Sequence, residues 1–167
     1  VTDVVVALPR DLAKSPPAYI ENDPRVSVVT GGVRRQDSVR NAFDQVNKNS
    51  EVVVIHDAVR PFVSEQLIAS TIDAAIKTGA AIAGLPAKDT IKKVGVDGIV
   101  GDTLRREEIV LAQTPQAFRT SVLRAALSLN LSDLETTDEA ALAERAGYRV
   151  QVVKGDPRNI KITTPED

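Results

Sequence analysis

Short apolar runs alternate with longer amphipathic stretches along most of the chain. The runs are rich in valine and isoleucine and are bounded by polar residues, glycine or proline, which is typical of buried strands. The run AAIAGL is apolar on both faces, as expected of a central strand in a parallel sheet. The pattern therefore predicts strands at 4–8, 26–29, 52–55, 80–85, 108–112, 149–153 and 159–162.

The first two amphipathic stretches have the periodicity of helices. Apolar residues at i, i+3, i+4 and i+7 predict a helix over 34–46, with Asp37 or Ser38 as its N-cap. A second helix is expected to open at Ser64 and to end at Gly79, which fits a C-cap.

Two more helices follow later in the chain. One runs through the apolar positions of 122–127, and the other ends at Gly147. Thr136-Thr137-Asp138-Glu139 matches a capping box that opens the last helix. Strands that alternate with helices predict an α/β fold with a mostly parallel sheet. Because there is no internal repeat and no linker, we expect a single domain over 1–167.

The segment 88–104 breaks this alternation because it has no helical period. Asp97-Gly98 is a turn signal between two β-leaning runs, so we predict a hairpin. The hairpin has little apolar surface to bury in its own core. We interpret it as an arm that packs on a partner, which hints at a dimer; a solvated surface hairpin is the alternative.

Polar residues gather directly after the predicted strands. In parallel α/β sheets, ligands bind at the carboxyl ends of the strands, so these residues are the candidates for a site. They are Gly31, Gly32, Arg34, Arg35 and Ser38 after 26–29; His56, Asp57, Ala58 and Arg60 after 52–55; Lys88, Asp89 and Thr90 after 80–85; Gln113, Thr114 and Gln116 after 108–112; and Lys161, Thr163 and Thr164 at the last strand.

These residue types favour a site for phosphate chemistry. Basic groups and a glycine turn at a helix N-terminus suit an anion such as phosphate, and an aspartate among them suits a divalent cation or a ligand hydroxyl. Phosphoryl or nucleotidyl transfer needs such positioning and charge stabilisation. Purely structural roles are the alternative: Gly31-Gly32 as a turn, Asp57 as a cap of the next turn, and His56 as a structural residue.

Composition narrows the class of protein. Apolar residues make up 43% and charged residues 26%, as in ordinary globular proteins, and the net charge of −2 gives no sign of a nucleic-acid surface. No apolar run is long enough to span a bilayer, so we expect no membrane association and a cytoplasmic location. The absence of cysteine and the single histidine argue against disulfides and zinc.

Six motifs occur in a series that is specific when taken together: GG-x-x-R-x-x-SV at 31–39, HDAVRP at 56–61, DTIK at 89–92, QTPQAF at 113–118, TDEA at 137–140 and NIKITTPED at 159–167. Over nearly the whole chain they resemble the 2-C-methyl-D-erythritol 4-phosphate cytidylyltransferases of the non-mevalonate isoprenoid pathway. The resemblance implies Mg²⁺-dependent transfer of CMP from CTP to 2-C-methyl-D-erythritol 4-phosphate, giving 4-diphosphocytidyl-2-C-methyl-D-erythritol and pyrophosphate. It also implies a Rossmann-like nucleotidyltransferase fold with helices on both faces of the sheet, and a homodimer in which 88–104 is an exchanged dimerisation arm.

The same resemblance implies roles for single residues. On the nucleotide side, Gly32 and Ser38 would contact the cytidine, Ala58 would lie near the ribose, and Lys161 would offset charge on the phosphates. Val33 departs from the acidic residue that some members of the family have there. The residues implied to hold the sugar-alcohol phosphate, some of them across the dimer, are Asp57, Arg60, Thr90, Arg106, Thr114 and Thr137. Asp57 and Lys161 are the implied catalytic residues.

Some parts of the family pattern have no counterpart in these 167 residues. They are the N-terminal glycine-rich loop with its arginine, a downstream lysine in a PKQ-like motif, and a terminal helix. The chain also lacks methionine and opens almost at once with a strand, so we expect the domain to be incomplete at both ends. Two alternatives remain: a cytidylyltransferase for ribitol or another polyol phosphate, and a catalytically inactive nucleotide-binding or dimerisation module.

Overall fold

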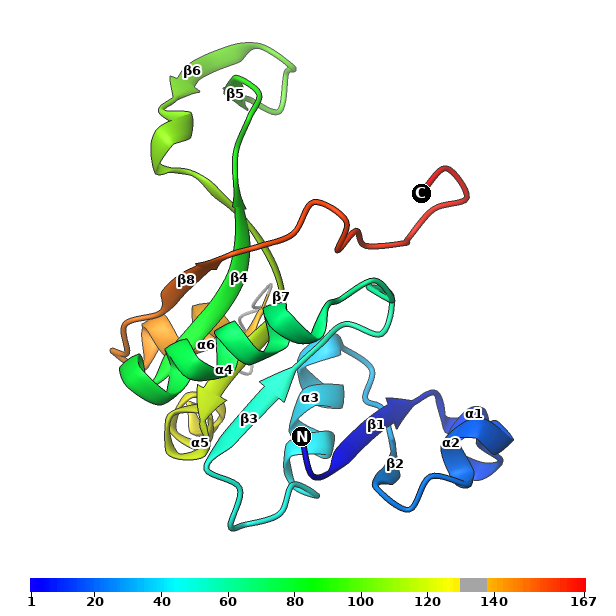
Figure 1. Cartoon of the computed structure of the whole chain (residues 1–167). Helices are drawn as coiled ribbons and strands as arrows, with labels where there is room; N and C mark the ends of the chain where they lie inside the picture. The colour runs from blue at the N-terminus through cyan, green and yellow to red at the C-terminus, as the bar shows by residue number, and fades with distance from the viewer. Residues whose placement is uncertain (130–137) are drawn as a thin grey trace. The chain divides into compact units, whose positions relative to one another are not determined.

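The computed structural model describes residues 1–129 and 138–167 and divides the chain into two compact units. Unit 1 comprises Val1–Val53 and Arg119–Tyr148, and unit 2 comprises Val54–Phe118 and Arg149–Asp167 (Figure 1). Each unit is formed from two stretches of chain that are distant in the sequence. Within the described ranges, no helix has both the length and the apolar character needed to cross a bilayer.

Unit 1 begins with a parallel pair of strands that are in register from Val4 opposite Val26 to Leu8 opposite Thr30. Parallel strands need a long crossover connection, and here the connection contains two short helices instead of a tight turn. The third helix follows the second strand directly. These elements are β1 (Val4–Leu8), α1 (Arg10–Lys14), α2 (Ala18–Glu21), β2 (Val26–Thr30) and α3 (Arg35–Phe43).

The second stretch of unit 1 contributes α5 (Thr120–Ser128) and α6 (Glu139–Arg145). Their apolar faces are buried, with Leu123 and Ala143 fully enclosed. Thr136, where the predicted capping box begins, lies outside the described residues. The N-cap of α6 is Asp138, whose carboxylate accepts a hydrogen bond from the backbone N–H of Ala141. The predicted C-terminal glycine, Gly147, has a φ of 85°.

Unit 2 contains most of a four-stranded sheet in the order β3 (Val52–Ile55), β7 (Val110–Arg119), β4 (Ala80–Pro86) and β8 (Gln151–Lys154). β4 is parallel to β8 and antiparallel to β7, with a register shift between Ile82 and Ala83. Residues 80–83 of β4 are buried, as the apolar run predicted. The sheet is therefore mixed, because the strand after the hairpin returns antiparallel to the strand before it.

α4 (Glu65–Thr78) packs against β4 through a face that includes Leu67 and Ala75. Its predicted ends are confirmed. The Ser64 side chain accepts from the backbone N–H of Leu67, and Gly79 ends the helix with a φ of 96°. The strand predicted at 159–162 is wrong, since the chain there is irregular and is held by hydrogen bonds to side chains.

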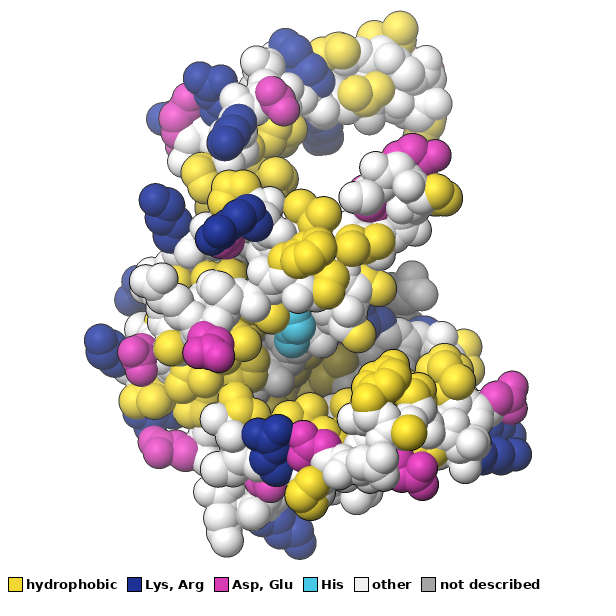
Figure 2. Space-filling model, turned by 45° about the vertical axis from the view of Figure 1, so that its right-hand side comes forward, with side chains coloured by type: hydrophobic (Ala, Val, Ile, Leu, Met, Phe, Trp, Pro, Cys, Tyr) yellow, Lys and Arg dark blue, Asp and Glu magenta, His cyan; other side chains and the backbone are white. Residues whose placement is uncertain are grey.

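The predicted hairpin is confirmed as β5 (Ile91–Val94) and β6 (Val100–Leu104), which form a separate antiparallel two-stranded sheet. Gly98 has a φ of 79°, the conformation that the predicted turn requires. Within unit 2 the hairpin extends beyond the end of β4 (Figure 1). Figure 2 shows apolar side chains mixed with basic ones on it, and Val96 and Ile99 are among its exposed apolar residues.

Candidate functional site

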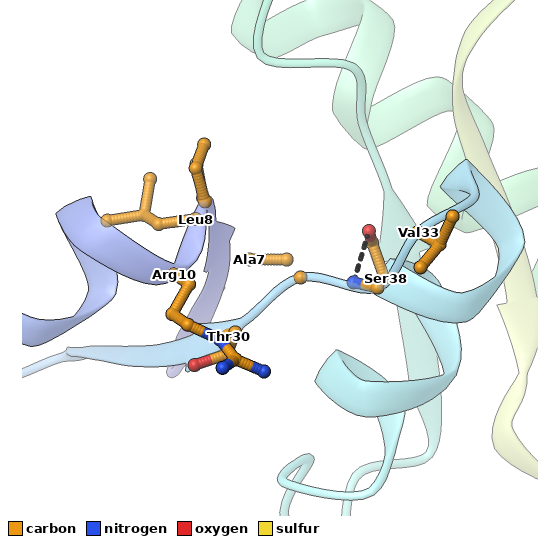
Figure 3. Close-up of a pocket in the computed structure, with 9 residues that line it drawn as sticks. Ala7, Leu8, Arg10, Thr30, Val33 and Ser38 are labelled. Atoms are coloured by element: carbon orange, nitrogen blue, oxygen red, sulfur yellow. Dashed lines mark hydrogen bonds between the residues drawn. The ribbon is translucent and has the colours of Figure 1, made fainter.

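Unit 1 has a cavity of about 570 Å³ at the carboxyl ends of β1 and β2 (Figure 3). This is the end of a parallel strand pair at which α/β proteins bind ligands. The lining is largely apolar side chains and backbone, with two hydroxyls, from Thr30 of β2 and Ser38 of α3, and one arginine from α1. The lining residues are Ala7, Leu8, Pro9, Arg10, Thr30, Gly31, Gly32, Val33 and Ser38.

The turn from Gly31 to Ser38, called here the glycine turn, forms one wall of this cavity. The Gly31 N–H donates to the carbonyl of Leu8 at 2.7 Å, and the Gly32 N–H donates to Ser38 Oγ at 3.0 Å. A Cβ on Gly32 would lie 2.2 Å from the Cβ of Asp37, so no larger residue fits without movement of the backbone. The two predicted nucleotide residues of unit 1, Gly32 and Ser38, therefore contact each other directly.

The first turn of α3 is held by charged side chains. Arg34 is the N-cap residue, and Asp37 accepts from its backbone N–H at 3.2 Å, so the predicted N-cap at Asp37 or Ser38 is wrong by three or four residues. The hydrogen bond from the Arg34 side chain lowers the pKa of the Asp37 carboxyl below its usual value. Arg35 donates from Nη1 to both carboxylate oxygens of Glu139, at 2.8 and 2.7 Å, which joins α3 to α6 within unit 1.

Glu139 is a buried carboxylate with 1% of its surface exposed. Burial raises its pKa above the usual value near 4.5, and the charge of Arg35 opposes this rise. The sequence motif TDEA includes Glu139. Glu139 was not among the predicted site residues, because it follows no predicted strand.

In unit 2, six residues converge beyond the end of β3, and we call them the strand-end cluster: His56, Asp57, Arg60, Thr114, Asn159 and Lys161. Lys161 Nζ lies 3.1 Å from Asp57 Oδ2, and the Asp57 N–H donates to Thr114 Oγ1 at 3.0 Å. The Asp57 side chain is 14% exposed, whereas that of Lys161 is 45% exposed. The two predicted catalytic residues are thus an ion pair at the surface of unit 2, with the carboxylate on the inner side.

Thr114 was predicted to follow a strand, but it lies inside β7, next to the register shift in its pairing with β4. It is 4% exposed, and its peptide bond to Pro115 is cis. Thr114 therefore reaches the cluster from the middle of β7, which runs antiparallel to β4, and not from the end of a parallel strand. Thr114 still lies beside Asp57, whose backbone N–H donates to its hydroxyl, although it does not follow a strand as predicted.

Two buried amides support the cluster: Gln113, which was among the candidates after the predicted strand at 108–112, and Asn159, which was not. Asn159 is fully buried and donates from Nδ2 to the carbonyl of Thr114 at 2.7 Å. The backbone carbonyl of Asn159 accepts from Arg60 Nη1 at 2.8 Å and from Gln113 Nε2 at 3.1 Å. These bonds hold the irregular segment before Lys161 against β7. Asn159 belongs to the family motif at 159–167, which was the signal that could have found it.

The remaining predicted site residues lie elsewhere. Ala58 is exposed in the turn after Asp57. Thr90 precedes β5, and Arg106 follows β6 and donates to the carbonyl of Lys88 at 2.8 Å, so both are at the base of the hairpin. Thr137 lies outside the described residues.

The residues of the strand-end cluster do not form a cage for a divalent cation. Asp57 is its one carboxylate, and within 1–129 and 138–167 no group of three or more histidine, cysteine or acidic side chains could hold a metal ion. Mg²⁺ commonly takes one or two carboxylates together with substrate phosphates, so a single aspartate supplies only part of a site.

Comparison with known proteins decides the family. A family model described as 2-C-methyl-D-erythritol 4-phosphate cytidylyltransferase matches residues 1–167. The chain belongs to this family. Proteins with that name from Syntrophus aciditrophicus (strain SB) and Acidobacterium capsulatum are 52% and 51% identical to it, over 84% and 86% of the chain. The chain spans about three fifths of these relatives' length, 60% and 62% respectively.

Solved structures of the family have the same fold. The 4-diphosphocytidyl-2C-methyl-D-erythritol synthase of Anaerococcus prevotii DSM 20548 matches with a TM-score of 0.90 and 33% identity, over 99% of this chain and 78% of that one. The 2-C-methyl-D-erythritol 4-phosphate cytidylyltransferase of Thermus thermophilus matches with a TM-score of 0.85 and 36% identity, over 98% and 77%. The expected α/β, Rossmann-like nucleotidyltransferase fold is thereby confirmed.

Proposed function

We propose that this chain carries out cytidylyl transfer from CTP to 2-C-methyl-D-erythritol 4-phosphate as part of a full-length enzyme. The proposal is supported by the family match over the whole chain and by relatives about 50% identical that carry this name. The single structural observation that carries it is the ion pair of Asp57 and Lys161 at the end of β3. It places a cation that can bind a phosphate next to a carboxylate that can accept from a hydroxyl of the same ligand.

In the proposed reaction, an oxygen of the acceptor's phosphate attacks the α-phosphorus of CTP. A new P–O bond forms, the bond between the α-phosphorus and the bridging oxygen breaks, and pyrophosphate leaves. Negative charge accumulates on the transferring group, so a nearby cation stabilises the transition state. Lys161 is exposed enough to exchange Asp57 for a phosphate oxygen. Asp57 would then accept from an acceptor hydroxyl.

The other proposed ligand contacts follow from charge and position in each unit. Arg60 and Thr114 belong to the strand-end cluster and would hold the acceptor phosphate there. Gly32 and Ser38 line the unit 1 cavity and would contact the cytidine, while Ala58 would lie near the ribose. We propose that Mg²⁺ is required and enters with the nucleotide's phosphates, since the described residues do not form a site of their own.

We also propose a cytoplasmic homodimer in which the hairpin packs on the partner subunit. The exposed apolar residues of β5, β6 and their turn support this, since a two-stranded hairpin has no core of its own. Thr90 and Arg106, at the base of the hairpin, would then contribute to acceptor binding. Sedimentation of a protein that lacks residues 92–100 should show monomers, and intact dimers would contradict the arm's role.

Pyrophosphate release tests the reaction itself. The full-length protein should release pyrophosphate with CTP and 2-C-methyl-D-erythritol 4-phosphate, and much more slowly with ribitol phosphate. Lys161→Ala should lower kcat at least tenfold, because a charge-assisted contact is lost. A preference for ribitol phosphate would replace the acceptor that we propose. Nucleotide binding without any turnover would instead indicate an inactive binding module.

A further inference from the structure

Both ring nitrogens of His56 contact polar atoms, and one contact fixes where the proton lies. His56 Nε2 is 3.0 Å from the backbone carbonyl oxygen of Arg60. A carbonyl oxygen can only accept, so Nε2 must carry a hydrogen and donate. In the neutral ring, Nδ1 is then an acceptor.

The second contact continues a directed chain of hydrogen bonds. His56 Nδ1 lies 3.0 Å from Thr114 Oγ1, which also accepts from the Asp57 N–H at 3.0 Å. The Thr114 hydroxyl has one hydrogen, and Nδ1 is its acceptor. The direction therefore runs from the Asp57 N–H to the Thr114 hydroxyl, then to the His56 ring, and ends at the Arg60 carbonyl.

We propose that His56 is a positioning residue of the strand-end cluster, acting as the neutral imidazole protonated at Nε2. The two ends of the chain of bonds are the backbones of Asp57 and Arg60, and the side chains of both are among those proposed to hold the acceptor. The turn between them is also closed by the Arg60 N–H, which donates to the Asp57 carbonyl at 2.9 Å. His56 therefore ties this turn to β7 through Thr114. The orientation of the ring follows from these bonds alone, and its effect on acceptor binding rests on the proposed function.

A merely space-filling histidine would not need these partners. Phenylalanine has a similar ring but neither hydrogen bond, so His56→Phe tests bonding separately from packing. Asparagine places an amide oxygen near Nδ1 and can still accept from Thr114, so His56→Asn should retain part of the chain of bonds. Thr114→Val removes the donor to Nδ1, and Thr114→Ser keeps it.

Nitrogen-15 NMR tests the tautomer without any turnover. His56 is the one histidine of these 167 residues, and in the full-length protein its ring signals are those that His56→Phe removes. At about pH 8, where an ordinary imidazole is neutral, we expect a single tautomer with a protonated Nε2 and a bare Nδ1. Thr114→Val should shift the Nδ1 signal, and Thr114→Ser should not. A ring protonated at Nδ1, a mixture of tautomers, or an Nδ1 signal indifferent to Thr114→Val would overturn the assignment.

Steady-state kinetics of the full-length protein tests positioning. His56→Phe loses both hydrogen bonds of the ring and should raise the KM for the acceptor by about five- to tenfold, while the KM for CTP stays within about twofold. His56→Asn should lie between His56→Phe and the wild type. If the variants lower Tm but leave the acceptor KM unchanged, His56 is structural and the positioning role is wrong. A wild type without turnover would refute the proposed function, whereas the NMR result would still decide the tautomer.

Discussion

The glycine turn of unit 1 and the strand-end cluster of unit 2 are both candidates for ligand binding, but they are built in opposite ways. The glycine turn consists mainly of backbone and leaves room because Gly32 has no side chain. The strand-end cluster is held by side chains that bond either one another or the backbone of another member. Substitutions that add side-chain atoms should therefore damage the glycine turn most, and substitutions that remove them should damage the strand-end cluster most.

The largest effect is expected from Gly32→Ala. The new Cβ would lie 2.2 Å from the Cβ of Asp37 and 3.0 Å from its carbonyl carbon, so the turn and the start of α3 must move apart. Overpacking of this kind costs about 2–3 kcal/mol. Urea unfolding should show this loss, and binding of CTP should weaken at the same time.

A matched control lies in the hairpin. Gly101→Ala places a Cβ whose nearest neighbour is the Lys93 carbonyl oxygen at 3.8 Å, which is ordinary contact. It should change stability by less than about 0.5 kcal/mol. If Gly32→Ala and Gly101→Ala change the unfolding free energy by the same amount, the close approach of Gly32 to Asp37 is not the reason that glycine is needed at position 32.

Thr114→Val should have the next largest effect, because it removes atoms from the strand-end cluster. The Asp57 N–H loses its acceptor, and His56 loses its donor, in a site where Thr114 is 4% exposed. Buried groups left without partners cost about 1–2 kcal/mol in unfolding free energy. Thr103→Val, on the exposed face of β6, removes a hydroxyl that accepts from Lys92 and should cost little. Equal losses for the two variants would contradict the role of burial.

The two regions also differ in how far the sequence could predict them. Asp57, Thr114 and Lys161 were expected at one edge of the sheet and do lie together, although Thr114 lies inside β7 and no strand forms at 159–162. What could not be predicted was the antiparallel direction of β7, because a short apolar run does not reveal its neighbours. The buried amide of Asn159 was also missed, since polar residues are usually exposed and only the fold shows which are enclosed.

At the glycine turn, the sequence predicted the strand, the helix and their junction, but not the N-cap residue of the helix. Both Asp37 and Ser38 are good N-cap residues, yet Arg34 occupies that position and Asp37 bonds back to it. Ser38 is instead used to accept from Gly32. The cap position goes with these bonds inside the turn and with the close approach of Gly32 to Asp37, which the capping preferences of single residues do not reveal.

Ser38→Ala should have a smaller effect than either substitution above. The hydroxyl accepts from the exposed Gly32 N–H, which water can satisfy in the variant. We expect a loss of about 0.5–1 kcal/mol in urea unfolding and a clearer loss of CTP affinity by calorimetry. Unchanged nucleotide affinity would mean that the hydroxyl only shapes the turn. Ser121→Ala, at an exposed position of α5, is the control for removing a surface hydroxyl.

The smallest expected effect is a pH dependence from Glu139, whose pKa is raised by burial in the folded state. The folded protein therefore holds this proton more tightly than the unfolded chain does, so the contribution of Glu139 to stability is greatest below about pH 4.5 and is lost as the pH rises through the folded pKa. Glutamine does not titrate, so the wild type should lose stability relative to Glu139→Gln over that rise, as measured by urea unfolding at several pH values. Glu144→Gln removes an exposed carboxylate from the same helix and controls for the change of charge. If the wild type instead gains stability over the variant as the pH rises, the attraction of Arg35 outweighs the cost of burial, and the ion pair between α3 and α6 would be a net source of stability for the glycine turn.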